Sequence, residues 1–174
     1  MKRKDLLFYI LLLLISIPVS AGWQRPVTNY TRHIYKAGNQ NWSIQQHDNG
    51  WIYVANNKGL LEFDGVEWNT YPIHNAKTRA VKVGHDGRIY IGGMEQFGYF
   101  TPNRLGGLEY TCLSDSLSPN VNVGVIWNIL LDGERVYFQS DRRFFYWEEG
   151  IVKKIDYSSE IYTSFILRNK LYIT

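Results

Sequence analysis

The sequence predicts an all-β protein: an incomplete β-propeller whose blades each contain four antiparallel strands. One short pattern recurs along the chain, marked by Tyr53, Tyr90, Tyr137 and Tyr172, with spacings of 37, 47 and 35 residues. A tight turn rich in Asn, Asp or Gly precedes each of these tyrosines, as in short β-hairpins. The content of 16% aromatic residues and 15 glycines is also typical of β-rich chains. Units of about 40 residues that repeat in register favour a propeller over a β-sandwich, the alternative fold.

The first 21 residues have the layout of a secretory signal peptide. A basic start precedes an apolar run over 6–19, and the small residues Val19, Ser20 and Ala21 form a cleavage site. The run is shorter than the roughly 20 residues that span a bilayer, and the open alternative is an uncleaved anchor. Cleavage removes three basic residues and one acid, so the net charge falls from +3 to +1. No basic block remains, and we expect no binding of nucleic acid by this segment.

The mature chain divides into a pre-blade segment and successive blades. The pre-blade segment, 22–40, is too apolar for a flexible tail and is expected to add a strand or to pack beneath the ring. No segment after the signal shows a helical period. The predicted units are blade 1 (41–75, strands 42–46, 51–55, 60–64 and 67–71), blade 2 (76–122, strands 79–83, 88–91, 96–100 and 109–113), blade 3 (123–160, strands 126–131, 136–139, 144–147 and 151–155) and the start of blade 4 (161–174).

The number of blades predicts that the ring continues. Propellers generally close with 4–8 blades, whereas these residues supply three and the start of a fourth. We therefore expect further blades, and any output domain, beyond residue 174.

No catalytic or metal-binding constellation stands out. Asp48, Asp86 and Asp132 occupy the same turn of successive repeats, where turn chemistry explains them. His47 and His85 also share a repeat position, and we interpret them as turn-flanking residues rather than metal ligands. The single cysteine, Cys112, allows no intrachain disulfide and is expected to act as a small apolar residue in a fourth strand. We expect no cofactor, no metal and no enzymatic activity in this segment.

The tryptophans suggest two uses. Aromatic faces can stack on sugars, but packing between blades is the commoner role. We assign most of them to the core; those considered are Trp42, Trp51, Trp68, Trp127 and Trp147.

Ligand binding is expected at the mouth of the central channel. Loops that lead into the first strand of each blade converge there with loops that join the second and third strands. The alternative for each loop residue is an ordinary solvated position. The candidate ligand-binding residues are Asn41, Asn56, Asn57, Arg79, Glu95, Gln96, Trp127, Asp141 and Arg142.

Two stretches resemble a known family of bacterial sensors. They are NYTRHIYKAGNQNWSIQQHDNGWIYVANNKGLLEFDG from Asn29 and TRAVKVGHDGRIYIGGMEQFGYF from Thr78. They are similar to the start of Bacteroidetes-type periplasmic sensor regulators with two-component-regulator propeller repeats and a triple-tyrosine domain. The resemblance implies a membrane helix and a cytoplasmic output downstream, either a helix-turn-helix transcriptional regulator or a histidine kinase. Blades 2 and 3 depart from the motif at 97–100 and 144–147, which makes the blades less regular.

These observations lead us to expect a periplasmic ligand-sensing segment of a transmembrane regulator, linked through the resemblance to glycan utilisation. Its expected partner is an oligosaccharide or a periplasmic or outer-membrane protein, and we expect the full-length protein to be dimeric and anchored in the inner membrane. Two alternatives stay open: a secreted propeller enzyme that acts on polysaccharide, and a non-catalytic adhesive repeat.

The signal peptide gives a direct prediction. Mature protein from the periplasmic fraction should begin at Gly22, because the cleavage site ends at Ala21. N-terminal sequencing measures this, and membrane-bound protein that still begins at Met1 contradicts it.

Overall fold

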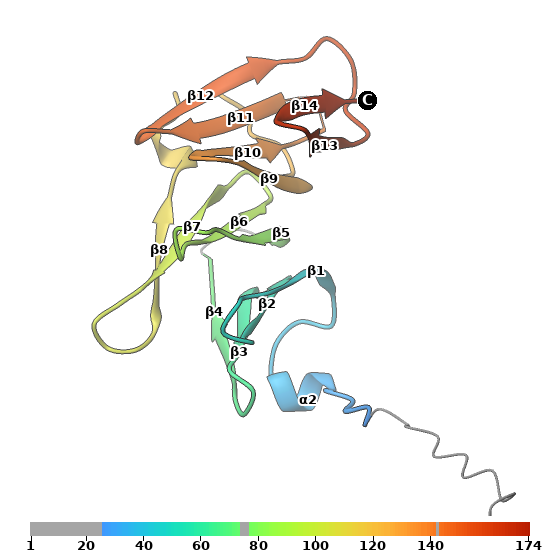
Figure 1. Cartoon of the computed structure of the whole chain (residues 1–174), viewed down its shortest axis with the longest axis vertical. Helices are drawn as coiled ribbons and strands as arrows, with labels where there is room; N and C mark the ends of the chain where they lie inside the picture. Colours follow the sequence, from blue (N-terminus) through green and yellow to red (C-terminus); the bar gives the residue numbers. More distant parts are fainter. Residues whose placement is uncertain (1–25, 74–76, 142) are drawn as a thin grey trace, which may run out of the picture.

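The computed structural model describes residues 26–73, 77–141 and 143–174. These residues form three four-stranded antiparallel sheets that follow one another along the chain, and then a two-stranded sheet (Figure 1). Each sheet pairs its strands in sequence order, so every connection within a blade is a hairpin. The all-β fold with four-stranded propeller blades is therefore confirmed, and the described sheets do not close into a ring.

The strands lie within a few residues of the predicted ranges. Blade 1 contains β1 (Asn41–Gln46), β2 (Ile52–Asn56), β3 (Gly59–Phe63) and β4 (Trp68–Tyr71). Blade 2 contains β5 (Thr78–Val83), β6 (Ile89–Gly93), β7 (Phe97–Pro102) and β8 (Leu108–Cys112). Blade 3 contains β9 (Asn128–Asp132), β10 (Arg135–Gln139), β11 (Arg143–Glu148) and β12 (Ile151–Asp156). The last sheet pairs β13 (Ser164–Leu167) with β14 (Lys170–Ile173).

The pre-blade segment differs from the prediction because it contains a helix. Helix α2 (Arg32–Tyr35) is one turn long, and a 3₁₀ turn, Ser114–Ser116, follows β8. Neither element is long enough to show a helical period in the sequence. Instead of adding a strand, the segment packs Tyr35 and Ala37 against Val54 and Leu61, on the face of blade 1 that lies away from blade 2. Figure 1 shows α2 beside the strands of blade 1.

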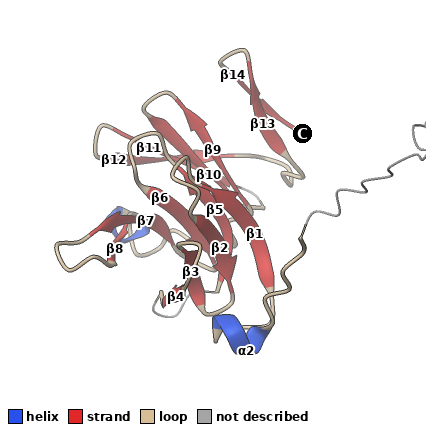
Figure 2. Cartoon of the chain, turned by 60° about the horizontal axis from the view of Figure 1, so that its bottom comes forward, coloured by secondary structure: helices blue, strands red, loops and turns tan. Residues whose placement is uncertain are grey.

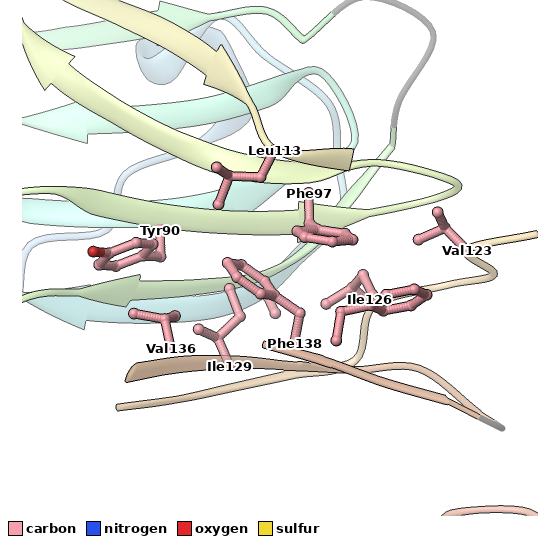
Figure 3. Packing of buried hydrophobic residues seen from close by; sticks show 10 residues of the cluster. Tyr90, Phe97, Leu113, Val123, Ile126, Ile129, Val136 and Phe138 are labelled. Carbon is pink, nitrogen blue, oxygen red and sulfur yellow. The ribbon is translucent and has the colours of Figure 1, made fainter. Parts of the chain in front are cut away.

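The core lies between the blades, and each repeat tyrosine contributes to it. Tyr53 belongs to the cluster between blades 1 and 2, and Tyr90 to the cluster between blades 2 and 3. Tyr137 packs in turn toward the last sheet. In Figure 3, Tyr90 and Phe97 of blade 2 lie opposite side chains from blade 3, which include Phe138. The rings of Phe97 and Phe138 stack with their centroids 4.4 Å apart.

The turn between β5 and β6 is held by its aspartate, as the turn chemistry predicts. The Asp86 carboxylate accepts hydrogen bonds from the Tyr90 hydroxyl at 2.7 Å and from the Arg88 guanidinium at 2.6 Å. Partial burial opposes ionisation of Asp86, but these hydrogen bonds outweigh it and lower the pKa of the carboxyl group. Asp86 therefore links this hairpin to the buried repeat tyrosine.

A buried carboxyl group lies in blade 1. Glu62 is 3% exposed, and its Oε1 accepts a hydrogen bond of 3.0 Å from the Tyr71 hydroxyl. Its Oε2 has no hydrogen-bond partner among the described residues. Burial raises the pKa of Glu62 above its ordinary value, although hydrogen bonds from Tyr71, Tyr53 and Asn69 oppose the shift.

We expect Glu62→Gln to raise the thermal midpoint of unfolding at pH 8. A carboxyl group with a raised folded-state pKa contributes its full stability below its ordinary pKa of about 4.3 and loses it as the pH rises through the folded pKa. A neutral amide keeps the acceptor for Tyr71 without becoming charged. Thermal melts of both proteins should show a difference at pH 8 that shrinks toward pH 4. An equal difference at every pH contradicts the assignment.

Candidate functional site

The first strands of the three blades form a continuous inner wall. Strands β1, β5 and β9 pack side by side, β1 against β5 and β5 against β9 (Figure 2). We call the end at which these three strands begin the rim. The turns β2–β3, β6–β7 and β10–β11 lie at the same end of the blades, because neighbouring strands are antiparallel. The topology therefore gathers the loops that the sequence analysis selected for ligand binding.

Two tryptophans and an arginine meet at the rim. The Arg79 guanidinium lies over the Trp42 ring, 4.1 Å from its centroid. The Trp42 and Trp127 rings make an edge-to-face contact with centroids 6.1 Å apart. Trp42 is 44% exposed and Trp127 is 50% exposed, so both indoles reach solvent. We call Trp42, Arg79 and Trp127 the platform.

Asn57, from the β2–β3 turn, holds two of the three platform residues in place. Its Oδ1 accepts hydrogen bonds from Trp42 Nε1 at 2.9 Å and from Arg79 Nη1 at 2.8 Å. The same Nη1 also donates to the Thr78 carbonyl oxygen at 2.9 Å. Burial lowers the pKa of Arg79, but a guanidinium group stays protonated in proteins. Asn57 therefore fixes the Arg79 cation against the Trp42 ring.

The three platform residues occupy one repeat position. In each blade, the residue two positions after the repeat tyrosine pairs with a residue of the first strand, and the platform residue directly precedes that partner. The pairs are Ser43 with Ala55, Ala80 with Gly92, and Asn128 with Gln139. The pairing register shifts at Trp42 and again at Arg79, as at a β-bulge. The extra residue at a bulge points its side chain in a new direction. This accounts for the orientation of the Trp42 and Arg79 side chains on the inner wall.

The platform includes one tryptophan that was not among the predicted ligand-binding residues. Arg79, Trp127 and Asn57 were candidates for ligand binding, and Trp42 joins them. A signal for Trp42 did exist, because it lies 11 residues before Tyr53 just as Arg79 lies 11 residues before Tyr90. The remaining tryptophans Trp51, Trp68 and Trp147 do pack against the apolar clusters.

Asn41 and Asn56 serve the fold. Asn56 is fully buried, and its Oδ1 accepts hydrogen bonds from the backbone N–H groups of Gly38 and Lys58, both at 2.9 Å. Its Nδ2 donates to the Gly38 carbonyl oxygen at 2.8 Å and to Asn41 Oδ1 at 2.6 Å. These bonds fasten the pre-blade segment to the β2–β3 turn, so Asn56 has no polar atom left for a ligand.

The remaining candidates lie at the turns of blades 2 and 3. The Glu95 carboxylate accepts hydrogen bonds from the N–H groups of Val123 and Gly124, at 3.0 and 3.1 Å, and so fixes the lead-in to blade 3. Glu95 and Asp141 line one shallow hollow together with Arg143. Gln96 Oε1 is buried and has no hydrogen-bond partner in the described part of the chain. Arg142 lies outside the described residues.

Two further hollows lie at the opposite end of the blades, beside the hairpins. His47, Asp48, His85 and Asp86 line one of them. Asn49 donates its backbone N–H to His47 Nδ1 at 3.1 Å, a contact within the turn. Among the described residues no group of three or more His, Cys, Asp or Glu side chains is placed to hold a metal ion.

Cys112 ends β8 and is half-buried beside the 3₁₀ turn. Its Sγ lies 3.1 Å from an Asp115 carboxylate oxygen and 3.2 Å from Ser114 Oγ. Burial raises the pKa of the thiol, although Ser114 opposes this shift. A raised pKa leaves the group less nucleophilic at neutral pH.

Comparison with known proteins shows the fold. No protein family profile and no curated protein match the chain. Among solved structures, virginiamycin B lyase from Staphylococcus aureus matches with a TM-score of 0.61 and 15% identity, over 78% of this chain and 50% of that one. A streptogramin B lyase matches with a TM-score of 0.56 and 17% identity, over 77% of this chain and 47% of that one.

A sensor domain matches as well. The extracellular domain of a protein assigned to a one-component system of B. thetaiotaomicron has a TM-score of 0.59 and 13% identity, over 80% of this chain and 20% of that one. This chain thus spans half or less of the length of each of these structures.

The lyases correct one expectation. We expected this segment not to be an enzyme, and the match to two lyases contradicts that inference. Blades of this architecture occur in enzymes, so neither the fold nor the scatter of carboxylates along the sequence argues against catalysis.

The predicted signal peptide lies outside the described residues. Within 26–73, 77–141 and 143–174, no helix is long and apolar enough to cross a bilayer. The extracellular domain among the matched structures is compatible with a location outside the cytoplasm.

The role of Asn56 gives a testable prediction. We expect Asn56→Ala to destabilise the protein by about 2–3 kcal/mol, since it leaves buried backbone groups at Gly38 and Lys58 without partners. Denaturant unfolding measures the loss, and limited proteolysis should cut the pre-blade segment faster in the variant. Asn39→Ala, an exposed asparagine in the same segment, is the matched control. Equal stability of the two variants contradicts the assigned role.

Proposed function

We propose that this chain is the ligand-sensing propeller segment of an extracytoplasmic sensor, and that its ligand binds at the platform. The observation that carries the proposal is the convergence of Trp42, Arg79 and Trp127 from three blades at one repeat position. Two half-exposed indoles in contact with each other, one of them covered by a fixed guanidinium, form a surface of the kind that binds ligands, with an apolar face and few oriented polar groups. Scattered surface aromatics would not share one register.

The finer identity rests on the sequence resemblance. We propose that the segment belongs to a periplasmic regulator with two-component-regulator propeller repeats and a triple-tyrosine domain, anchored in the inner membrane. Its output would be a helix-turn-helix domain or a histidine kinase. The fold-level match to the extracellular domain of a one-component system supports a sensing role. The association of such regulators with glycan utilisation makes an oligosaccharide the proposed ligand.

We place the ligand site at the rim rather than at the hairpin end because the groups at the rim are available to contact a ligand. The turn at Asp86 is committed to hydrogen bonds with Arg88 and the buried Tyr90. At the rim, by contrast, both indoles are half-exposed, and Asn57 fixes the position of Trp42 by a hydrogen bond to its Nε1. A site needs both accessible groups and a rigid support, and the platform has both.

A reporter assay in cells that carry the complete receptor tests this proposal. Cells are grown on a panel of oligosaccharides, and reporter output is measured together with receptor abundance. Arg79→Ala and Trp127→Ala should reduce the response at least tenfold at normal abundance, because each removes a group that would touch the ligand. Asp86→Ala should instead lower abundance, since it costs roughly 1–3 kcal/mol of stability through the orphaned Tyr90 hydroxyl.

The opposite pattern contradicts the proposal. If Arg79→Ala and Trp127→Ala respond normally while Asp86→Ala abolishes the response at full abundance, the sensing surface lies at the hairpin end. Arg104→Ala, which removes one exposed positive charge from the β7–β8 loop, controls for a general effect of charge.

A further inference from the structure

Arg79 is a cation without an anionic partner in the described part of the chain. Ion pairs do form elsewhere in that part of the chain, as between Arg88 and Asp86 and between Arg135 and Glu148. Both hydrogen bonds of Arg79 use Nη1, and both go to neutral oxygens, those of Asn57 and of the Thr78 carbonyl. No described residue bonds to Nε or Nη2. These two nitrogens form the edge of the guanidinium that binds a carboxylate in a bidentate manner.

Two exposed lysines flank the residues that bond to Arg79, whereas Glu95, the acidic residue in the β6–β7 turn of the same blade, is bonded to the backbone N–H groups of Val123 and Gly124. Lys58 follows Asn57 in the β2–β3 turn, and Lys77 directly precedes Thr78; both lysines are exposed. The groups that contact the platform are neutral: Asn57 joins Trp42 to Arg79, and Gln40 accepts a hydrogen bond of 2.6 Å from Asn57 Nδ2. A partly buried guanidinium that lacks a counter-charge is suited to receive one from a ligand.

The platform position continues into the last sheet. Thr163 pairs with Thr174, which lies two residues after the repeat tyrosine Tyr172, and Tyr162 precedes Thr163. The Tyr162 N–H donates to the Thr174 carbonyl oxygen at 2.8 Å, just as the Trp127 N–H donates to Gln139 at 2.9 Å. Tyr162 is 81% exposed. In four successive sheets, a Trp, Arg, Trp or Tyr therefore lies at one register position, close to the start of the first strand.

We propose that the platform recognises an acidic oligosaccharide, with sugar rings on the aromatic residues and a carboxylate on the free edge of Arg79. This inference rests on the proposed function and names the class of ligand for that site. Sugar rings present an apolar face to Trp127 and Tyr162, while a uronate carboxylate supplies the missing counter-charge. A row of four positions suits an oligomer better than a single sugar.

Matched ligands test the charge. The probes are trimers of galacturonate, of mannuronate and of glucuronate, each compared with its methyl ester, which keeps the rings and removes the charge. Titration monitored by tryptophan fluorescence and by calorimetry should show that at least one acid binds tenfold or more tightly than its ester. If no acid binds, or if acids and esters bind equally, the proposal is overturned.

Matched variants test the residues. Arg79→Ala should abolish the preference for acid over ester, whereas Arg104→Ala should keep it. Asn57→Asp keeps the acceptor for Trp42 and Arg79 but supplies an internal carboxylate, and it should also weaken acid binding tenfold without weakening ester binding. Trp127→Ala should weaken acid and ester by the same factor, because it removes stacking surface and no charge. Circular dichroism melts confirm that each variant is folded.

The two proposals fail in distinguishable ways. If the reporter response depends on Arg79 and Trp127 but the preference for acids is absent, sensing at the platform stands and the acidic class is wrong. If acids bind selectively in vitro while the platform variants signal normally, the platform is a binding site without the sensing role. An acid preference that survives Arg79→Ala places the anion elsewhere and overturns the role of Arg79.

Discussion

The structure depends on the need of each blade to bury both of its faces. Neighbouring residues of a strand point to opposite faces of a sheet, so Tyr53 packs toward blade 2 while Val54 packs against the pre-blade segment. One four-stranded sheet cannot satisfy both faces by itself. Stability therefore comes from contacts between neighbouring blades, and the large aromatic side chains lie where those contacts are made, as Tyr90, Phe97 and Phe138 show.

The same packing sets the position of the platform. A Cβ atom on Gly92 would lie 2.4 Å from Ile126 Cγ2, so the absence of a side chain at Gly92 lets the lead-in to blade 3 lie against β6. Trp127 follows Ile126 directly and is placed by this contact. Ala55 and Gln139 fill the equivalent position in the other blades, and Gln139 accepts a hydrogen bond from the Ser164 hydroxyl of the next sheet. The size and polarity of the residue at this position thus determine how the following segment packs against each blade.

The sequence predicted what depends on local periodicity and missed what depends on distant partners. Spacing of the repeat tyrosines was enough to predict the blades and to select Arg79 and Trp127 at the rim. Trp42 lies at a bulge, and the only mark of that bulge in the sequence is the 11-residue spacing to the repeat tyrosine that Trp42 shares with Arg79. Asn56 and Glu95 have the polarity of ligand-binding residues, but their hydrogen bonds go to Gly38 and to Val123 and Gly124. Only the folded chain shows that these groups are already occupied. Catalysis was misjudged for a related reason, since scattered carboxylates in a repeat say nothing of what a complete ring brings together.

Under the proposed function, the origin of the platform in three blades bears on how a ligand would be sensed. A ligand shifts an equilibrium only if it binds one arrangement of the protein more tightly than another. A single sheet offers few alternative arrangements for a ligand to select, because its hydrogen-bonded ladders fix the strands relative to one another. Between blades there is no hydrogen-bonded ladder of strands: contact is made by packed side chains and by a few backbone hydrogen bonds at the rim, such as that from the Ile126 N–H to the Gly93 carbonyl oxygen at 2.9 Å. Small changes in the spacing of β1, β5 and β9 are therefore the available motion. A ligand that touches Trp42, Arg79 and Trp127 at once binds best at one such spacing and stabilises it, because the three residues belong to three separate sheets. Under the proposed function, the repeat position that gathers the platform residues is therefore also the position from which ligand binding would be transmitted to all three blades.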